Sequence, residues 1–113
     1  MRKSPTDSSA LTAYDAVGVS LSTLAEADAY RVTVATFEPG GTIGAHPTTL
    51  PQLFHVVDGH GWVSGADGEK VQIVAGEHVV WQALEDHASG SHDGMVAVIV
   101  QCVDVEAFRS ALR

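Results

Sequence analysis

The sequence contains very little cysteine, and this scarcity excludes several kinds of scaffold and site. Cys102 is the single cysteine in a chain of 113 residues. No disulfide can form within the chain, and one thiol cannot supply a cysteine-rich zinc site. Because a fold without disulfides suits a reducing compartment, we expect a cytoplasmic protein.

Basic residues are also scarce. Six lysines and arginines stand against 14 aspartates and glutamates, which gives a formal net charge of −8. This charge repels phosphate backbones and anionic lipid headgroups, and the basic residues are too scattered to form a stripe. The chain also lacks a run of about eighteen apolar residues, and no apolar stretch typical of a signal peptide follows the first residues. We therefore expect neither a nucleic-acid partner nor a membrane partner.

The length and the apolar content predict one globular domain. A chain of 113 residues that is 45% hydrophobic and 18% charged can bury one core but has no room for a second. Residues 1–10 are polar, rich in serine and without periodicity, which is typical of a flexible tail. We expect the folded domain to span residues 11–113.

Short runs of β-branched and aromatic residues, separated by turn residues, predict an all-β barrel or sandwich. Within the run Tyr30–Phe37, Val32 and Val34 share one face and Arg31 and Thr33 the other, as in a half-buried strand. Breaks are expected at Pro39-Gly40-Gly41, at Gly59, at Gly76 and at Ser89-Gly90-Ser91. The other expected strands are Val17–Leu21, Gln52–Val57, Gly61–Ser64, Glu69–Val74, His78–Trp81 and Met95–Val103.

Two local signals complete the expected fold. The pair Asp67-Gly68 predicts a tight hairpin turn, because both residues tolerate the positive φ values of a primed turn. Near the end, Asp104 can cap a short helix in which Val105, Phe108 and Leu112 fall on one face. The prediction is one β-barrel closed to hide its strand edges, with a short C-terminal helix against it.

Histidine is abundant, and imidazole is both the commonest transition-metal ligand and the usual acid–base group near neutral pH. The six histidines are His46, His55, His60, His78, His87 and His92. In an extended strand His55 points away from the face that Gln52 and Phe54 share, so it is a poor candidate for a common site. His60 and His78 follow turn glycines, where exposure is the usual outcome.

The segment from Gly40 to Gly59 resembles the first motif of the cupins, G-x5-H-x-H-x3-E-x6-G, with every spacing kept. Gly40, His46 and Gly59 match the motif. Thr48 stands in the place of the second histidine, and Gln52 stands in the place of the glutamate. Two of the three ligand types are therefore changed.

The segment from Gly76 to Ser91 resembles the second cupin motif, G-x5-P-x-G-x2-H-x3-N. Gly76 and His87 match, whereas Gln82, Leu84 and Ser91 replace the proline, the glycine and the asparagine. The resemblance covers residues 40–91 directly. It implies a single cupin jelly-roll β-barrel, and cupins commonly form dimers, so a homodimer is expected.

The resemblance also implies a shared pocket at the barrel mouth. In cupins the motif side chains hold one divalent metal, so His46, Gln52 and His87 are the implied ligands of Fe, Mn, Ni, Zn or Cu. Thr48 and Phe54 share the inward faces of these segments and are expected to line the pocket. His92 lies in the loop after His87 and is a further pocket candidate.

Glu85 is the candidate general base. In an extended segment it shares the face of His87, whereas Asp86 does not. The competing interpretation is that Glu85 and Asp86 belong to a solvated acidic loop. The large aromatic residues Phe37, Phe54, Trp62 and Trp81 fit a barrel core better than a substrate platform, since aromatic side chains dominate burial.

Three functions remain open from the residues and the resemblance. The first is a metal-dependent enzyme that acts on a small organic molecule as an oxygenase, isomerase or lyase. The second is a metal-free pocket, as in epimerase-like cupins, in which His46 or His87 works as the base with Glu85. The third is a non-enzymatic module that binds a metabolite or a partner, because one fold hosts many functions.

Overall fold

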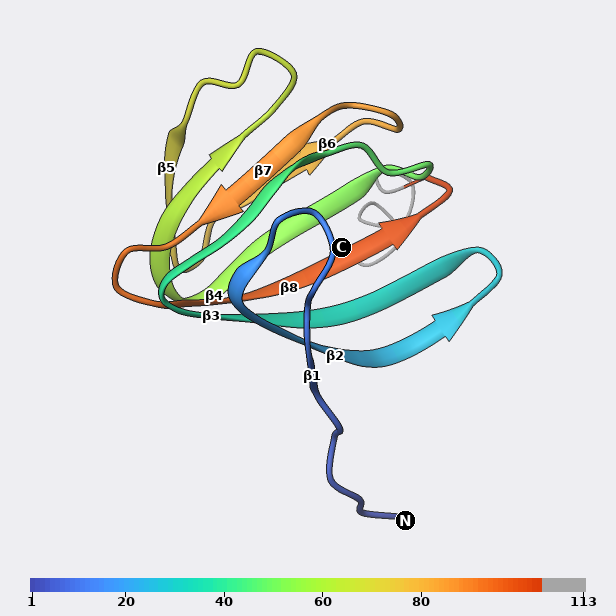
Figure 1. Ribbon diagram of the computed structural model, residues 1–113. Helices are drawn as coiled ribbons and strands as arrows, with labels where there is room; N and C mark the ends of the chain where they lie inside the picture. The colour runs from blue at the N-terminus through green and yellow to red at the C-terminus, as the bar shows by residue number, and fades with distance from the viewer. Residues whose placement is uncertain (105–113) are drawn as a thin grey trace.

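The chain forms a β-barrel that carries no helix in residues 1–104, the part that the computed structural model describes (Figure 1). The helix expected after Asp104 falls on residues 105–113 and lies outside the described residues. No helix among the residues described has the length and apolar character needed to cross a membrane. The strands are β1 (Ser9–Ala10), β2 (Val17–Ala27), β3 (Tyr30–His46), β4 (Gln52–Ser64), β5 (Val71–Val74), β6 (His78–Trp81), β7 (His87–Gly90) and β8 (Met95–Cys102).

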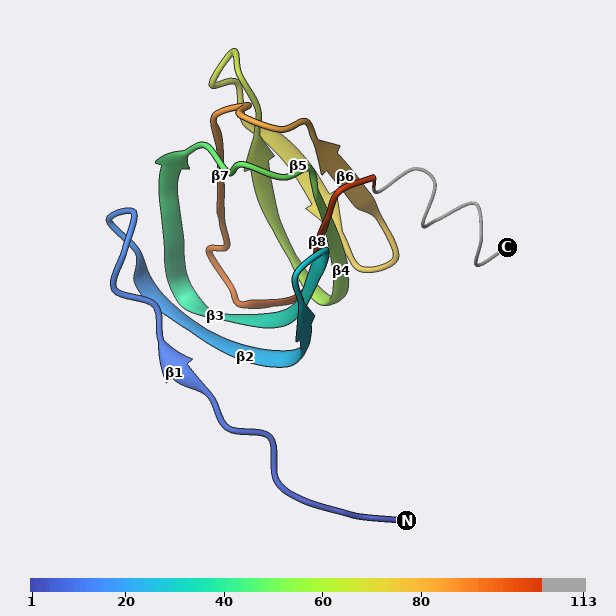
Figure 2. The ribbon, with the colours of Figure 1, turned by 90° about the vertical axis from the view of Figure 1, so that its right-hand side faces the viewer.

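Two long strands close the barrel. β3 pairs with both β7 and β8, and β4 also pairs with both, so the four strands form a ring. β2 extends the sheet beyond β3, while β5 and β6 pair with β4. Figure 2 looks into this ring, with β3 and β4 on opposite sides. The predicted all-β jelly-roll barrel is confirmed.

The expected breaks at Pro39-Gly40-Gly41 and at Gly59 are bends within strands. β3 pairs with β8 as far as Phe37 and with β7 from Thr42 onward, so the glycine pair marks the point where the strand changes partners. At Gly59 the φ angle is +74°, and a Cβ atom there would overlap the carbonyl oxygen of Gly94. Bends of this kind allow one long strand to pair with two different partners along its length.

The alternation within β3 is as predicted, but the polar face is the one that points inward. Thr33 is buried and Arg31 lines the interior, while Val32 and Val34 face outward and are only partly buried. The inward positions further along β3, Ala35 and Phe37, are buried apolar residues. The barrel interior is therefore apolar at its centre and polar near the start of β3. The largest buried side chains of the core cluster include Phe37, Phe54, Trp81, Met95 and Ile43.

β7 was not among the expected strands, because Ser89-Gly90-Ser91 has the composition of a turn. All four of its residues are buried. A Cβ atom at Gly90 would lie 2.6 Å from Nε1 of Trp62, so a small residue is needed where the indole packs against the strand. The small residues of this segment, which resemble a turn in the sequence, therefore serve close packing against Trp62.

Two further local features differ from the expectation. Ser9 and Ala10, the last residues of the expected tail, form β1 and pair with Leu21 and Ser20 of β2. The hairpin between β4 and β5 is present, but its turn is formed by residues 65–68. Gly68 donates its N–H to the carbonyl of Gly65 and has φ +74°, so Asp67-Gly68 does not form the two-residue primed turn.

Candidate functional site

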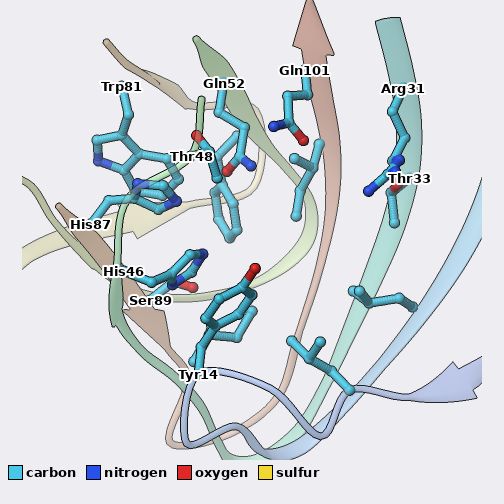
Figure 3. A pocket seen from close by; sticks show the side chains of 15 residues that line it. Tyr14, Arg31, Thr33, His46, Thr48, Gln52, Trp81, His87, Ser89 and Gln101 are labelled. Atoms are coloured by element: carbon cyan, nitrogen blue, oxygen red, sulfur yellow. The ribbon is translucent and has the colours of Figure 1, made fainter. Parts of the chain in front are cut away.

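His46 and His87 are cross-strand partners at one end of the barrel. His46 ends β3 and His87 begins β7, and their Cα atoms are paired in the register of the two strands. The two imidazole centroids lie 4.5 Å apart, with the ring planes tilted by 56°. Figure 3 shows both rings on the same side of a pocket inside the barrel.

The backbone determines which nitrogen of each ring faces the pocket. Nδ1 of His46 lies 2.8 Å from the carbonyl oxygen of Gly44, and Nδ1 of His87 lies 3.0 Å from that of Glu85. A carbonyl oxygen only accepts, so each Nδ1 carries the hydrogen and donates it. In the neutral form of each ring, Nε2 then carries a lone pair. Among the described residues, Nε2 of His87 is a buried nitrogen without a hydrogen-bond partner.

Two aromatic rings cover the histidines. Tyr14 stacks on His46 with a centroid separation of 3.8 Å and an interplanar angle of 9°. Trp81 stacks on His87 at 4.3 Å and 16°. Tyr14 reaches this position from a loop in which both it and Asp15 have positive φ, at 58° and 53°. Such strained backbone is concentrated at functional sites.

The pocket has a volume of about 170 Å³ and brings together most of the expected site residues. His46, Thr48, Gln52, Phe54 and His87 all line it. Tyr14, Arg31, Thr33 and Gln101 also reach it, although no pattern in the sequence indicated this. The complete lining is Leu11, Tyr14, Leu21, Arg31, Thr33, Ile43, His46, Thr48, Gln52, Phe54, Trp81, His87, Ser89, Ile99 and Gln101.

Solved structures share this barrel. An RmlC-like cupin from Shewanella frigidimarina is 18% identical with a TM-score of 0.77, over 91% of this chain and 88% of that one. The chain has the cupin fold. The polyketide cyclase RemF from Streptomyces resistomycificus is 17% identical with a TM-score of 0.79, over 92% and 80% of the two chains. KdgF from Halomonas sp. is 16% identical with a TM-score of 0.75, over 90% and 92%.

Comparison with protein-family models finds no match, and comparison with curated protein sequences finds no significant match. The cupin likeness therefore rests on the fold, since all of these identities are low.

Burial is the main influence on His87 in this cupin barrel. It lowers the pKa of His87 from its ordinary value of 6.5, and the neighbouring His46 lowers it further. The hydrogen bond to the Glu85 carbonyl and the charges of Glu85 and Asp86 act in the opposite direction. Because the net effect is a lower pKa, the Nε2 lone pair of His87 is free at neutral pH.

Glu85 lies outside the pocket and is not among the residues that line it. Its carboxylate accepts hydrogen bonds from the backbone N–H of Gln82, at 2.9 Å, and of Ala66, at 3.2 Å. Leu84 has φ 65°, and the Glu85 N–H bonds to the carbonyl of Gln82, so the chain turns here. The alternation expected of an extended segment does not apply in a turn. In its observed position Glu85 links its own turn to the loop that contains Ala66.

The other histidines lie outside the pocket. His92 follows β7 with a side chain that is 95% exposed, and it lies near Asp93. His60 contacts the same aspartate at 3.2 Å. His55 and His78 are partners on β4 and β6, with ring centroids 6.4 Å apart, and His55 points away from the pocket as expected.

Two imidazole donors and one neutral amide oxygen line the same pocket. No group of three or more His, Cys, Asp or Glu side chains in residues 1–104 is arranged to hold a metal. The two imidazoles have their Nδ1 atoms bonded to carbonyls, which is the usual outer arrangement of metal-bound histidines. Gln52 lines the same pocket and offers an amide oxygen. The orphaned Nε2 of His87 is the observation that favours a bound partner.

Proposed function

We propose that this cupin binds a small organic molecule in its barrel, beside one divalent transition metal held by His46, His87 and Gln52. The observation that carries the proposal is the pair of Nε2 lone pairs on cross-strand histidines. One of these nitrogens is buried without a partner, which is costly unless something else binds there.

The ligand set suits a borderline metal such as Fe, Mn, Ni, Zn or Cu. Imidazole nitrogen binds these ions well, and one amide oxygen adds a weak third ligand. A bound ion would supply Lewis-acid chemistry, toward an oxygen of the substrate or a water molecule. Because His46, His87 and Gln52 are all neutral, they leave the positive charge of the ion largely uncompensated.

The rest of the pocket positions the organic molecule. Tyr14 and Trp81 cover the two imidazoles and restrict the access of water to them. Figure 3 shows the Tyr14 hydroxyl inside the pocket, where it can donate a hydrogen bond to the bound molecule. Phe54 and Ile99 supply apolar contact. These side chains fix the molecule near the histidines.

The names of similar structures support small-molecule chemistry. Besides the polyketide cyclase, they include a predicted oxalate decarboxylase from Thermotoga maritima, at 18% identity and a TM-score of 0.69. A structure described as DMSP lyases is also among them, at 21% identity and a TM-score of 0.67, over 74% of this chain and 47% of that one. We propose a reaction of the oxygenase, isomerase or lyase class for this chain.

Metal content tests the proposal. Protein purified without a histidine tag is expected to carry close to one transition-metal ion per chain, measured by plasma mass spectrometry. His46→Ala and His87→Ala are expected to lose it, because each removes one of three protein ligands. His55→Ala is the matched control, since His55 faces away from the pocket. Protein that carries no metal but still binds a small molecule would contradict the proposed metal site and would still support the proposed ligand pocket.

A metal-free pocket is the second candidate, and the low pKa of His87 favours it. A neutral imidazole with a free Nε2 can take a proton from a bound molecule. Glu85 lies outside the pocket, so in this mechanism the base is His87 alone. Turnover that persists in a chelator and disappears in His87→Ala identifies this mechanism. Ligand binding without turnover identifies a non-enzymatic module.

We also propose that two copies associate through the outer face of the β3–β8 sheet. Val32 is paired with Val100, and Val34 with Val98, and all four turn outward while only partly buried. A row of outward valines is unusual for a surface left in water. Sedimentation equilibrium is expected to give a dimer, and Val34→Lys is expected to weaken it.

A further inference from the structure

A row of inward-facing polar side chains crosses three neighbouring strands at the pocket. Arg31 of β3 is the Cα partner of Gln101 of β8, and Gln101 is in turn the partner of Gln52 of β4. Two residues further along β3, Thr33 faces the same pocket. Figure 3 shows Arg31 and Thr33 on the side of the pocket opposite His46 and His87. The pocket therefore has two polar walls, one of imidazole and one of guanidinium, hydroxyl and amide groups.

The charge of the pocket lining is positive although the protein is acidic. Arg31 is the only side chain with a permanent charge among the described residues that line the pocket, and no carboxylate lines it. The net charge of the whole chain is −8. An anionic group at this end of the barrel thus meets the guanidinium of Arg31, which is 56% exposed and paired with Glu26, while no carboxylate lines the pocket itself.

The position of Glu26 leaves part of the Arg31 guanidinium available. Glu26 accepts a hydrogen bond from Nε of Arg31 at 2.6 Å. Glu26 and Asp28 line a separate depression outside the barrel, which Arg31 and Gln101 also border. A guanidinium has five N–H donors, so the contact at Nε holds the group in place and leaves the terminal amino groups to bind elsewhere.

The size of the pocket limits what can bind between the two walls. An apolar cavity of about 150 Å³ takes up benzene. The pocket here, at about 170 Å³, is of similar size and has apolar side chains such as Phe54 and Ile99 between its polar walls. It suits a molecule with a small apolar body and a polar group at each end.

We propose that the ligand of this pocket is a small carboxylic acid, whose carboxylate is bound by Arg31, with Gln101 and Thr33 as further donors. The planar guanidinium matches a carboxylate with two parallel hydrogen bonds. The opposite end of the acid lies toward His46 and His87. This inference rests on the proposed function, since it takes the barrel pocket to be the ligand site. It adds the class of ligand and the residue that selects it.

The specificity follows from charge. An acid and its primary amide have nearly the same shape, but only the acid carries the negative charge that complements Arg31. An amide also presents two N–H donors toward a wall that already donates. Discrimination against the amide by about tenfold or more is expected, since tenfold corresponds to about 1.4 kcal/mol.

The test compares matched probes by fluorescence. Trp81 lies in the pocket on His87, so its emission reports on ligands. Trp62, the other tryptophan, is replaced by Phe in every variant so that the signal comes from Trp81 alone. Acetate, propionate and benzoate are titrated against acetamide, propionamide and benzamide, with inorganic phosphate as a further anion. Titrations are run both with a chelator and with added Zn²⁺.

Three variants separate the sources of a preference for acids. Arg31→Gln is expected to remove the preference, with unchanged thermal unfolding as evidence of an intact fold. Glu26→Gln removes the charge that bonds to Nε of Arg31 and is expected to keep or increase the preference. His46→Ala is expected to keep it as well, which excludes a metal as the group that binds the carboxylate.

The outcomes distinguish this inference from the function on which it rests. Acids that bind about tenfold tighter than amides, through Arg31, support it. Equal binding of acids and amides overturns the inference and leaves the pocket as a ligand site. A preference that Arg31→Gln keeps and His46→Ala removes assigns the carboxylate to the metal and overturns the role of Arg31. Phosphate that binds tighter than every carboxylate overturns the ligand class. Absence of binding by every probe contradicts the pocket itself.

Discussion

Trp81 lies almost parallel to His87, with the two ring centroids 4.3 Å apart and the planes at 16°. Both side chains are buried, with 4% of Trp81 and 3% of His87 exposed. The indole holds the imidazole against β7 while the Glu85 carbonyl binds its Nδ1. The orientation of the free Nε2 is therefore determined by one stacking contact and one hydrogen bond.

Removal of the Trp81 ring is expected to affect stability and protonation together. Trp81→Ala should lower the free energy of unfolding by about 3–5 kcal/mol, as for other buried aromatic residues. It should also raise the pKa of His87 toward its ordinary value, because burial is the main cause of the present shift. Urea unfolding and histidine NMR titration measure the two effects. Trp81→Phe keeps a ring over His87 and should show a smaller change in both.

The low pKa of His87 makes the metal-free protein less stable in mild acid. The unfolded chain binds a proton on this imidazole more tightly than the folded chain does. The contribution of His87 to the free energy of unfolding is therefore at its full value above pH 6.5, and it decreases as the pH falls through the lower folded-state pKa of His87. The loss approaches at most about 1.4 kcal/mol per pH unit. Urea unfolding in chelator, from pH 7.5 downward, measures it. His87→Gln should flatten this dependence, whereas His92→Gln, at an exposed position, should leave it unchanged.

Strand alternation and motif spacing predicted five of the residues that line the pocket, His46, Thr48, Gln52, Phe54 and His87. His46, Gln52 and His87 reach one pocket because the motif spacing and the strand period agree. Tyr14 could not be predicted, since it reaches His46 only through positive φ at two successive residues. The sequence pattern of β3 also did not reveal which face points inward. The valines would be expected in the core, but they lie on the outside, and Arg31 and Thr33 line the pocket. Glu85 departs from the expected face because the chain turns at Leu84.

Two truncations test where the tail ends. Removal of residues 2–8 should leave the free energy of unfolding within about 0.5 kcal/mol of the full chain, as for other surface changes. Removal of residues 2–10 also deletes β1, which pairs with β2 through Ser9 and Ala10. It should cost more, on the order of 1 kcal/mol. Thermal and urea unfolding of the two chains measure the difference, and equal stability would show that β1 contributes nothing.

A restored carboxylate should strengthen metal binding. Gln52→Glu places a negative charge beside the two imidazoles, and the attraction to a divalent ion is large where water is excluded. Its affinity for Zn²⁺, measured by calorimetry, should exceed that of the native protein by about tenfold or more. Leu53→Glu adds the same charge to the neighbouring residue, which does not line the pocket, and should leave the affinity unchanged.

The central claim is that the Nε2 atoms of His46 and His87 form one binding centre, and histidine NMR tests it most directly. Protein labelled with ¹⁵N in its histidines is titrated with Zn²⁺ after treatment with a chelator. The account predicts that the Nε2 resonances of His46 and His87 shift together, while both Nδ1 atoms stay protonated on their backbone carbonyls. In His46→Ala the remaining His87 resonance should no longer shift with Zn²⁺, and in His87→Ala the remaining His46 resonance should no longer shift. Shifts confined to His55, His60, His78 or His92, with His46 and His87 unchanged, would contradict it.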